Sequence, residues 1–147
     1  MGYYIQQRTT QFCIKAKNQT KALVAVKGLV GQEPIGAHFS WVGNFSDADS
    51  FQEVMEEWRW EVEFNERGDV IDLFFNGQKL GDDELLFQTI APFVEAGSYI
   101  EILGEEGEMW RWAFDDKECT ELSPTIIWTK GEINENRNKS KKDGRKS

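Results

Sequence analysis

The sequence predicts a single α+β domain, built as a mostly antiparallel sheet of five to seven strands with helices packed on one face. The first reason is composition, since 147 residues with 39% hydrophobic and 13% aromatic side chains are enough for one core. The second is that the spacing of apolar residues changes from helical to alternating at Trp58. The third is that short apolar runs separated by turn residues fill the second half of the chain.

The first predicted element is a strand over residues 3–14, which are rich in aromatic, β-branched and threonine residues. A helix follows over residues 18–30, with Asn18 or Thr20 as its cap. Its apolar side chains at helical spacing are Ala22, Leu23, Val26, Leu29 and Val30. The alternation of residues 38–42 then predicts a brief strand.

A capping box predicts the second helix, because the side chains of Ser50 and Glu53 can each accept a backbone N–H at its start. Its apolar stripe consists of Phe51, Val54, Met55 and Trp58. Alternation from Trp58 to residue 64, a turn over residues 65–69 and a returning strand over residues 70–75 predict a hairpin. The side chains of the returning strand expected to face inward are Ile71, Leu73 and Phe75.

The third helix is predicted to begin at residues 81–84, whose carboxylates suit the positive end of a helix dipole. Pro92 should kink this helix and Gly97 should end it. Its buried face consists of Leu86, Phe87, Ile90, Ala91 and Val94. The remaining predicted strands form a three-stranded meander over 99–103, 109–114 and 119–122, and residues 125–128 close the domain. The domain therefore covers residues 1–129, and the basic tail over residues 130–147 is predicted to be disordered.

The tripeptide Trp-Arg-Trp occurs at residues 58–60 and again at residues 110–112. In a strand, each copy would place two indoles on one face and a guanidinium on the other. Because apolar residues continue the same alternation, the indoles are assigned to the core. Arg59 and Arg111 are then expected on the solvent face, paired with glutamates of neighbouring strands.

Charge is distributed unevenly along the chain. The formal net charge is −9, but residues 130–147 carry seven basic and three acidic side chains, so the first 129 residues carry −13. A domain with that charge repels phosphate backbones, so it is not expected to bind nucleic acid directly. A basic protein is the expected partner, and the tail is suited to contact acidic surfaces.

The chain shows no sign of a membrane or secreted protein. No apolar run approaches the ~18 residues of a membrane span, and the start lacks the basic and apolar regions of a signal peptide. A cytoplasmic location is therefore expected, where Cys13 and Cys119 would be free thiols.

Catalytic equipment is sparse. His38 is the only histidine, and no metal-ligand spacing or phosphate-binding loop occurs, so no metal or cofactor is expected. A small carboxylate-dependent hydrolase stays open as an alternative, with Asp82, Asp83, Glu101 and Glu108 as its pool of acids and bases. A non-enzymatic binding module is favoured.

The binding surface is expected to combine acidic and aromatic side chains. Its predicted members are Arg59, Glu61, Glu63, Glu101, Glu105, Glu106, Glu108, Arg111 and Trp41. Trp41 and Trp128 are expected to be partly exposed. A phage or mobile-element inhibitor of a host nucleic-acid-handling or defence system would suit a negatively charged face. A toxin-immunity-type binding partner is the alternative of the same class.

Several runs of the chain resemble a family of small acidic proteins associated with bacteriophage, plasmid and other mobile-element genomes. The runs that carry the resemblance are residues 39–42, 58–61, 81–84, 90–101 and 110–114. The resemblance covers about residues 38–128 and implies a bacterial or phage source. It implies no activity and no site residue.

Overall fold

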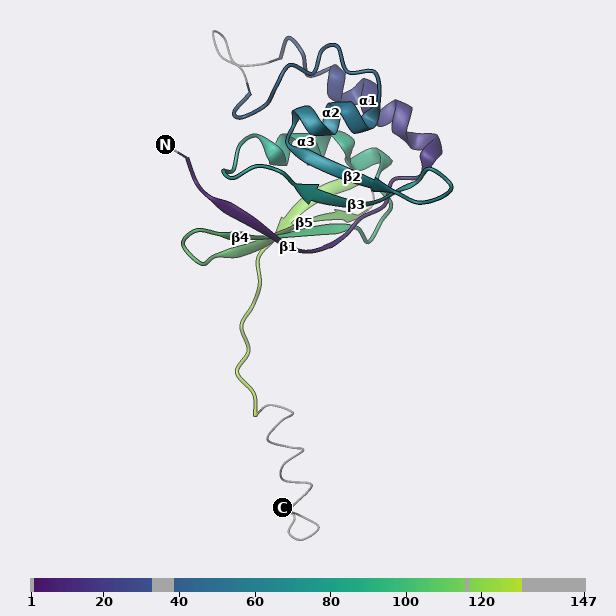
Figure 1. The fold of residues 1–147 in the computed structure, drawn as a ribbon. Helices are drawn as coiled ribbons and strands as arrows, with labels where there is room; N and C mark the ends of the chain where they lie inside the picture. The colour runs from purple at the N-terminus through teal and green to yellow at the C-terminus, as the bar shows by residue number, and fades with distance from the viewer. Residues whose placement is uncertain (1, 33–38, 116, 131–147) are drawn as a thin grey trace.

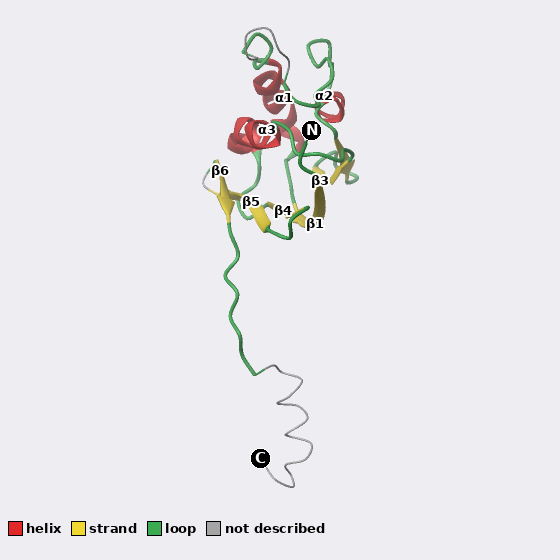
Figure 2. Cartoon of the chain, turned by 90° about the vertical axis from the view of Figure 1, so that its left-hand side faces the viewer, coloured by secondary structure: helices red, strands yellow, loops and turns green. Residues whose placement is uncertain are grey.

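The computed structural model describes residues 2–32, 39–115 and 117–130 and has two layers (Figure 1). The helices lie on one face of the strands, and the side view in Figure 2 shows no helix of the described residues on the opposite face. The α+β class is therefore confirmed, as is the packing of helices on one face. No helix within the described residues has the length and apolar character needed to span a bilayer. The predicted tail lies outside the described residues beyond Lys130.

Six strands are described, and they form two sheets instead of one. The strands are β1 (Ile5–Gln11), β2 (Trp60–Phe64), β3 (Val70–Phe75), β4 (Tyr99–Gly104), β5 (Met109–Asp115) and β6 (Glu118–Leu122). The larger sheet is antiparallel with the order β1-β4-β5-β6, and the smaller sheet is the β2–β3 hairpin. The expectation of a single sheet of five to seven strands is wrong, whereas the predicted meander is confirmed as β4, β5 and β6.

The side chain of Gln7 marks the place where the two sheets meet. Its amide donates to the carbonyl oxygen of Leu73 at 2.8 Å and accepts the backbone N–H of Phe75 at 2.7 Å. Isolated bridges join the same two segments on either side, Tyr4 to Lys79 and Ile14 to Val70. A side chain thus replaces the backbone pairing between β1 and β3, which is why the six strands do not form one ladder.

The neighbours run in the order β2-β3-β1-β4, with helices between β1 and β2 and between β3 and β4. This is the order of the split β-α-β arrangement, extended here by β5 and β6. Many unrelated functions use that topology, so the fold alone carries no functional conclusion.

The helices are α1 (Gln19–Lys27), α2 (Phe51–Glu57) and α3 (Asp83–Ile90), with 3-10 turns at Ala16–Asn18 and Ala91–Phe93. Ser50 caps α2, because its hydroxyl accepts the Glu53 N–H at 3.1 Å. The Glu53 carboxylate accepts the N–H of Asp49 at 2.7 Å, so the capping box closes one residue earlier than predicted. α3 ends before Pro92 instead of kinking at it, since proline lacks the N–H that would continue the helix.

Aromatic rings fill the core between the two layers. The Phe87 ring of α3 lies 5.1 Å from the Trp60 ring and 5.1 Å from the Trp112 ring, so it joins the two Trp-Arg-Trp copies. Trp58, Trp60 and Trp112 are fully buried, and Trp110 is half-buried. The core assignment of the indoles is therefore confirmed for three and in part for the fourth.

The first Trp-Arg-Trp is a junction between helix and strand. Trp58 caps the end of α2, Arg59 has a φ of 75°, and β2 begins at Trp60. The positive φ of Arg59 breaks the alternation, so the prediction of a strand from Trp58 is wrong. The second copy lies within β5 as predicted.

Two other segments differ from the predictions. Residues 39–42 form a turn with a φ of 65° at Trp41, and His38 lies outside the described residues. Residues 125–128 lead away from the sheet (Figure 1), and Ile126, Ile127 and Trp128 are 75%, 75% and 90% exposed. The proline at position 124 has no N–H with which to extend the pairing of β6.

A register shift in the β2–β3 hairpin changes which residues of β3 face inward. The shift falls between Glu63 and Phe64, and beyond it Phe64 pairs with Val70. Val70 and Leu73 are fully buried, whereas Ile71 is 40% exposed. The expected inward position of Ile71 is therefore wrong, because the extra residue of the bulge turns its side chain outward.

Both cysteines are free, as expected, and both are half-buried. Burial raises the pKa of the Cys13 thiol and raises that of the Cys119 thiol to about 12. Neither sulfur is therefore activated as a nucleophile.

Candidate functional site

The nine residues predicted to form one binding surface lie in four separate places. Arg59 and Trp41 line a hollow beside the β3–α3 connection, Glu61 and Glu63 face outward from β2, Glu101 and Arg111 face outward from the larger sheet, and Glu105, Glu106 and Glu108 lie at the β4–β5 turn. Trp41 is 49% exposed, which confirms its expected partial exposure. The structure therefore does not bring the nine together, and each group has its own local chemistry.

Arg59 is part of the structural framework and not of the solvent face. Its side chain is 14% exposed and donates to the Lys79 carbonyl oxygen at 2.7 Å and to the Asp83 carboxylate at 3.0 Å. A Cβ at Gly77 or Gly81 would lie 2.9 Å from a guanidinium nitrogen, so both glycines leave room for this side chain. The expectation that Arg59 faces solvent is wrong, because its left-handed backbone turns the side chain inward.

Asp83 holds this arrangement together from the start of α3. It is 1% exposed and accepts the Trp60 indole N–H at 2.9 Å and the Gly81 backbone N–H at 3.0 Å, in addition to the Arg59 guanidinium. The neighbouring Asp82 is more exposed and accepts the backbone N–H of Ser40 at 2.7 Å. Asp83 therefore has a structural role that its position at a helix start did not indicate.

Glu101 is neutralised on the open face of the larger sheet. Its carboxylate lies 2.9 Å from the Nε of Arg111 and 3.6 Å from the Nε of Arg8. Glu101 and Arg111 stand opposite each other in the β4–β5 register, so the predicted cross-strand pair is confirmed. The Arg111 guanidinium also lies 4.1 Å from the centre of the Tyr99 ring. This face offers little free charge to a partner.

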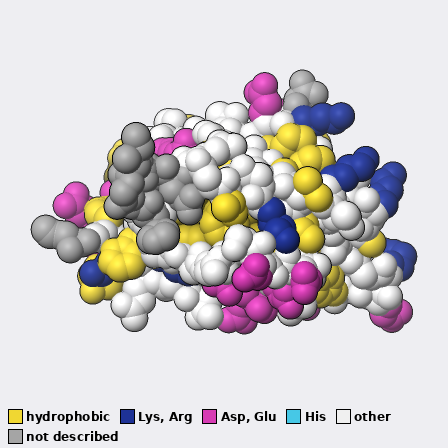
Figure 3. Space-filling model, turned by 90° about the horizontal axis from the view of Figure 1, so that it is seen from above, with side chains coloured by type: hydrophobic (Ala, Val, Ile, Leu, Met, Phe, Trp, Pro, Cys, Tyr) yellow, Lys and Arg dark blue, Asp and Glu magenta, His cyan; other side chains and the backbone are white. Residues whose placement is uncertain are grey.

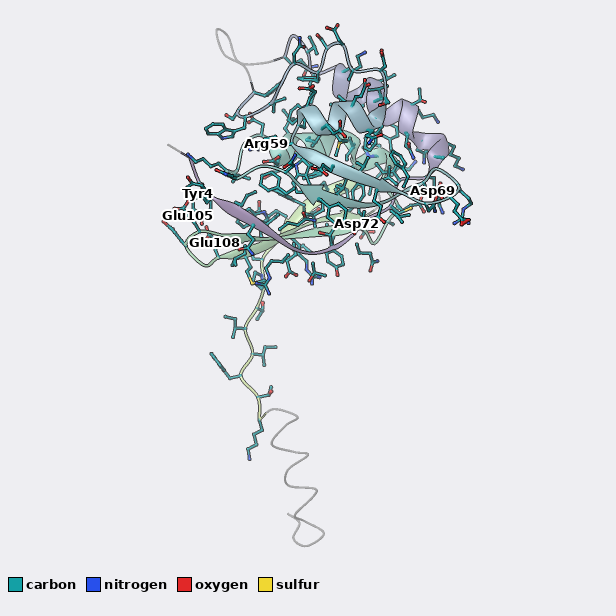
Figure 4. The ribbon with its side chains drawn as sticks, viewed as in Figure 1. Tyr4, Arg59, Asp69, Asp72, Glu105 and Glu108 are labelled. Atoms are coloured by element: carbon teal, nitrogen blue, oxygen red, sulfur yellow. The ribbon has the colours of Figure 1, made fainter. Side chains whose placement is uncertain are left out.

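The β4–β5 turn is fastened to the start of the chain. Glu105 accepts the backbone N–H of Tyr4 at 2.6 Å, and Glu108 accepts the hydroxyl of Tyr3. The Tyr3 hydroxyl is the main cause that lowers the pKa of Glu108, so that carboxyl stays charged in more acidic solution than usual. Figure 4 shows Tyr4, Glu105 and Glu108 together at the end of the molecule opposite to Asp69.

The outer face of the β2–β3 hairpin combines carboxylates with an exposed aromatic ring. Glu61 stands opposite Phe74 and Glu63 opposite Asp72 in the register, so all four side chains point to the same side. Glu61 and Glu63 are exposed, and Phe74 is 47% exposed. This side faces away from the buried Trp60, which fixes its orientation toward solvent.

More carboxylates precede this hairpin in the chain. They lie on or just before α2 and are Asp47, Asp49, Glu53, Glu56 and Glu57, all of them exposed. α2 and β2 pack against each other, and Figure 3 shows acidic side chains gathered at one edge of the molecule, at the lower centre of the view. We call these five residues, with Glu61, Glu63, Asp72 and Phe74, the acidic face. In the described part of the chain, no carboxylate of the acidic face forms an ion pair with lysine or arginine.

The carboxylates suggested for a hydrolase each have other partners. Asp83 is bound by Arg59, Glu101 lies between two arginines, and Glu108 is bound by Tyr3. Glu101 and Glu108 line different hollows. These contacts give the hydrolase hypothesis no support. The described residues also contain no group of three or more histidine, cysteine, aspartate or glutamate side chains placed to hold a metal ion.

Comparison with known proteins finds no match for the chain among family models, curated proteins or solved structures. The resemblance to a mobile-element family therefore stays a prediction, and the surface geometry is what bears on the function of this chain.

Sequence reasoning missed the contribution of α2 and β3 to the acidic face. The sequence was sufficient to predict three of these positions, because the apolar stripe of α2 leaves Glu53, Glu56 and Glu57 on the outer side of the helix. No sequence pattern predicted that Phe74 lies opposite Glu61, because this pairing depends on the register of the hairpin.

Proposed function

We propose that this protein is a non-enzymatic binding module that holds a basic protein on its acidic face. The observation that carries the proposal is a set of carboxylates, all exposed except the half-buried Asp72, that have no cationic partner in the described chain, together with the exposed Phe74 opposite Glu61. Elsewhere on the surface, Glu101 is paired with arginines and Glu108 with Tyr3. The acidic face thus keeps its charge available to a partner, unlike Glu101 and Glu108.

Charge attraction would accelerate association with the partner, and exposed apolar side chains would stabilise the complex. Single exposed ion pairs contribute only about 0.2–1 kcal/mol each, so several are needed for a useful affinity. A uniformly negative surface also accelerates the encounter with a basic protein, and this effect weakens as salt rises. Phe74 and Ile71, which are 47% and 40% exposed, supply apolar area of the kind found at the centre of protein interfaces.

The class of partner follows from the sign of the charge. Proteins that handle nucleic acids carry basic surfaces that bind phosphates, and a negative face can occupy such a surface. The charge of −13 on residues 1–129 supports this proposal for an inhibitor of a nucleic-acid-handling or defence system. The same face would serve a toxin-immunity pair, in which the basic partner is a single toxin.

A matched pair of double variants tests the role of the face. Glu61→Gln with Glu63→Gln removes two charges from the acidic face, and Glu95→Gln with Glu118→Gln removes two exposed charges elsewhere. Partners retained from a bacterial lysate on each immobilised protein are quantified by mass spectrometry at about 50 mM and about 300 mM salt, where screening lengths differ.

The expected result is a set of basic proteins that the wild type and the control variant retain at low salt and the face variant loses. Equal retention by both variants would show that binding follows net charge alone and would overturn the proposal. If the wild type retains no basic protein at low salt, the proposal is rejected.

A further inference from the structure

A second feature, separate from the acidic face, is a hollow of about 450 Å³ between the start of the chain, α3 and the last two strands. This volume lies within the ~300–1,000 Å³ of typical ligand pockets. The residues that line it are Tyr3, Leu80, Gly81, Glu84, Glu108, Trp110, Trp112 and Glu121. Aromatic and acidic side chains predominate, and no lysine or arginine is among them.

Two indoles form part of the wall. Trp112 is 1% exposed and packs against the Phe87 ring at 5.1 Å, so its position is set by the core. Trp110 is half-buried and meets Trp112 edge to face, with centroids 5.9 Å apart and an interplanar angle of 74°. The indole N–H groups of both are buried and have no acceptor among the described residues. Both nitrogens are closed off from solvent, as is the indole nitrogen of Trp58 in the core, so a ligand in the hollow would meet the rings and not these N–H groups.

Three carboxylates reach the same hollow from different elements. Glu84 is exposed in the first turn of α3, and Glu121 is exposed on β6 opposite Trp112 in the register. Glu108 precedes Trp110 by two residues and is held by the Tyr3 hydroxyl. The lining therefore carries three carboxylates and no basic side chain, a composition that suits a cation.

We infer that this hollow binds the cationic side chain of a lysine or arginine presented by a peptide or protein. The partly exposed rings of Trp110 and Tyr3 attract ammonium and guanidinium groups, and the carboxylates form charge-assisted hydrogen bonds with them. The same chain already shows this preference nearby, since the Lys79 ammonium lies 5.0 Å from the Tyr4 ring and 5.5 Å from the Trp41 ring.

The absence of basic and amide side chains from the lining favours a cation over a sugar. Sugar hydroxyls need a mixture of donors and acceptors, whereas the polar side chains of this hollow are mostly carboxylate acceptors. The inference does not depend on the acidic face, because the hollow lies on α3, β5 and β6 and the face lies on α2, β2 and β3.

Small probes test the hollow on the full chain without a protein partner. N-acetyl-L-arginine amide and N-acetyl-L-lysine amide are titrated against neutral N-acetyl-L-citrulline amide, followed by calorimetry and by the indole N–H signals in NMR spectra. The Trp110 and Trp112 signals are identified with Trp110→Phe and Trp112→Phe variants. The expected result is that the cations bind and move these two signals, while citrulline leaves them in place.

A matched pair of variants on β6 distinguishes the hollow from general attraction. Glu121→Gln faces the hollow and should weaken binding of the arginine probe by about three- to tenfold. Glu118→Gln removes the same charge from the same strand on the opposite face and should leave the affinity unchanged. The Glu61→Gln, Glu63→Gln double variant should also bind the probe normally, so the two proposals succeed or fail separately.

Several results would overturn the inference. They are equal binding of citrulline and arginine, equal loss in the Glu121 and Glu118 variants, no binding of either cation, and binding of a neutral disaccharide such as cellobiose in place of the cations.

Discussion

Replacing Asp83 by asparagine tests the framework around Arg59. The carboxylate is 1% exposed and pairs with a guanidinium that is 14% exposed, so removing its charge leaves a nearly buried cation without a counterion. Breaking a buried pair in this way costs about 3–5 kcal/mol. The Lys79 carbonyl and the Phe75 ring, 5.1 Å from the guanidinium, remain in contact with Arg59. We therefore expect the lower end of that range.

Such a loss is large for a domain of this size. Folded domains are stable by about 5–15 kcal/mol, so about 3 kcal/mol is a substantial fraction. At about 2–4 °C per kcal/mol, the melting temperature of Asp83→Asn should fall by roughly 6–12 °C. Guanidinium unfolding followed by tryptophan fluorescence measures the free energy, and an unchanged slope would show that both proteins unfold to the same extent.

The adjacent Asp82→Asn is the matched control. Asp82 accepts one backbone N–H, from Ser40, and is more exposed, so its replacement should cost about 1 kcal/mol. A double-mutant cycle with Arg59→Gln should show a coupling energy of at least about 1 kcal/mol between Arg59 and Asp83. The reasoning is refuted if Asp83→Asn destabilises no more than Asp82→Asn, or if the cycle shows no coupling.

Three further predictions concern acid stability, thiol reactivity and the junction of the sheets. The backbone N–H of Ala16 is the main cause that lowers the pKa of Asp69 in the folded protein. The Asp69 carboxylate therefore stabilises the fold fully above its unfolded pKa of about 3.9. This stabilisation is lost as the pH falls through the lower pKa of the folded state. Denaturant midpoints of Asp69→Asn should therefore fall less than those of wild type as pH drops below about 4. The thiol of Cys119, with a pKa of about 12, should react with Ellman's reagent at pH 8 at least ~100-fold more slowly than free cysteine, and equal rates would show that it is not held in a buried site. Gln7→Met leaves two backbone groups of β3 without partners and should lower the unfolding free energy by about 1–3 kcal/mol, whereas Gln6→Met at the neighbouring exposed position should change it little.

Capping residues and the spacing of apolar side chains were sufficient to predict the second helix and the C-terminal meander. The hydroxyl of Ser50 caps α2, and the stripe from Phe51 to Met55 faces the core, because helical spacing places apolar residues on one side. The meander follows in the same way from alternating side chains and turn residues. The same spacing leaves the three glutamates of α2 on its outer side, and these are a third of the nine residues of the acidic face.

Long-range contacts overruled local patterns elsewhere. Alternation placed Arg59 in solvent, but Asp83, 24 positions later, draws it into the interior through a left-handed turn. Gln7 looked like an ordinary strand residue, and only its bonds to β3 divide the sheet. Residues 125–128, predicted to close the domain, pair with no strand of the described structure.

The sequence by itself determined the α+β class, the burial of most tryptophans and the excess of negative charge. These follow from composition and periodicity, which act over a few residues. Only the tertiary structure decided which carboxylates stay free, since that depends on whether a cation from a distant element reaches them. Glu101 is reached by two arginines and the acidic face by none in the described chain. The hollow of two tryptophans and three glutamates arises for the same reason, because α3, β5 and β6 bring together side chains that no sequence spacing connects.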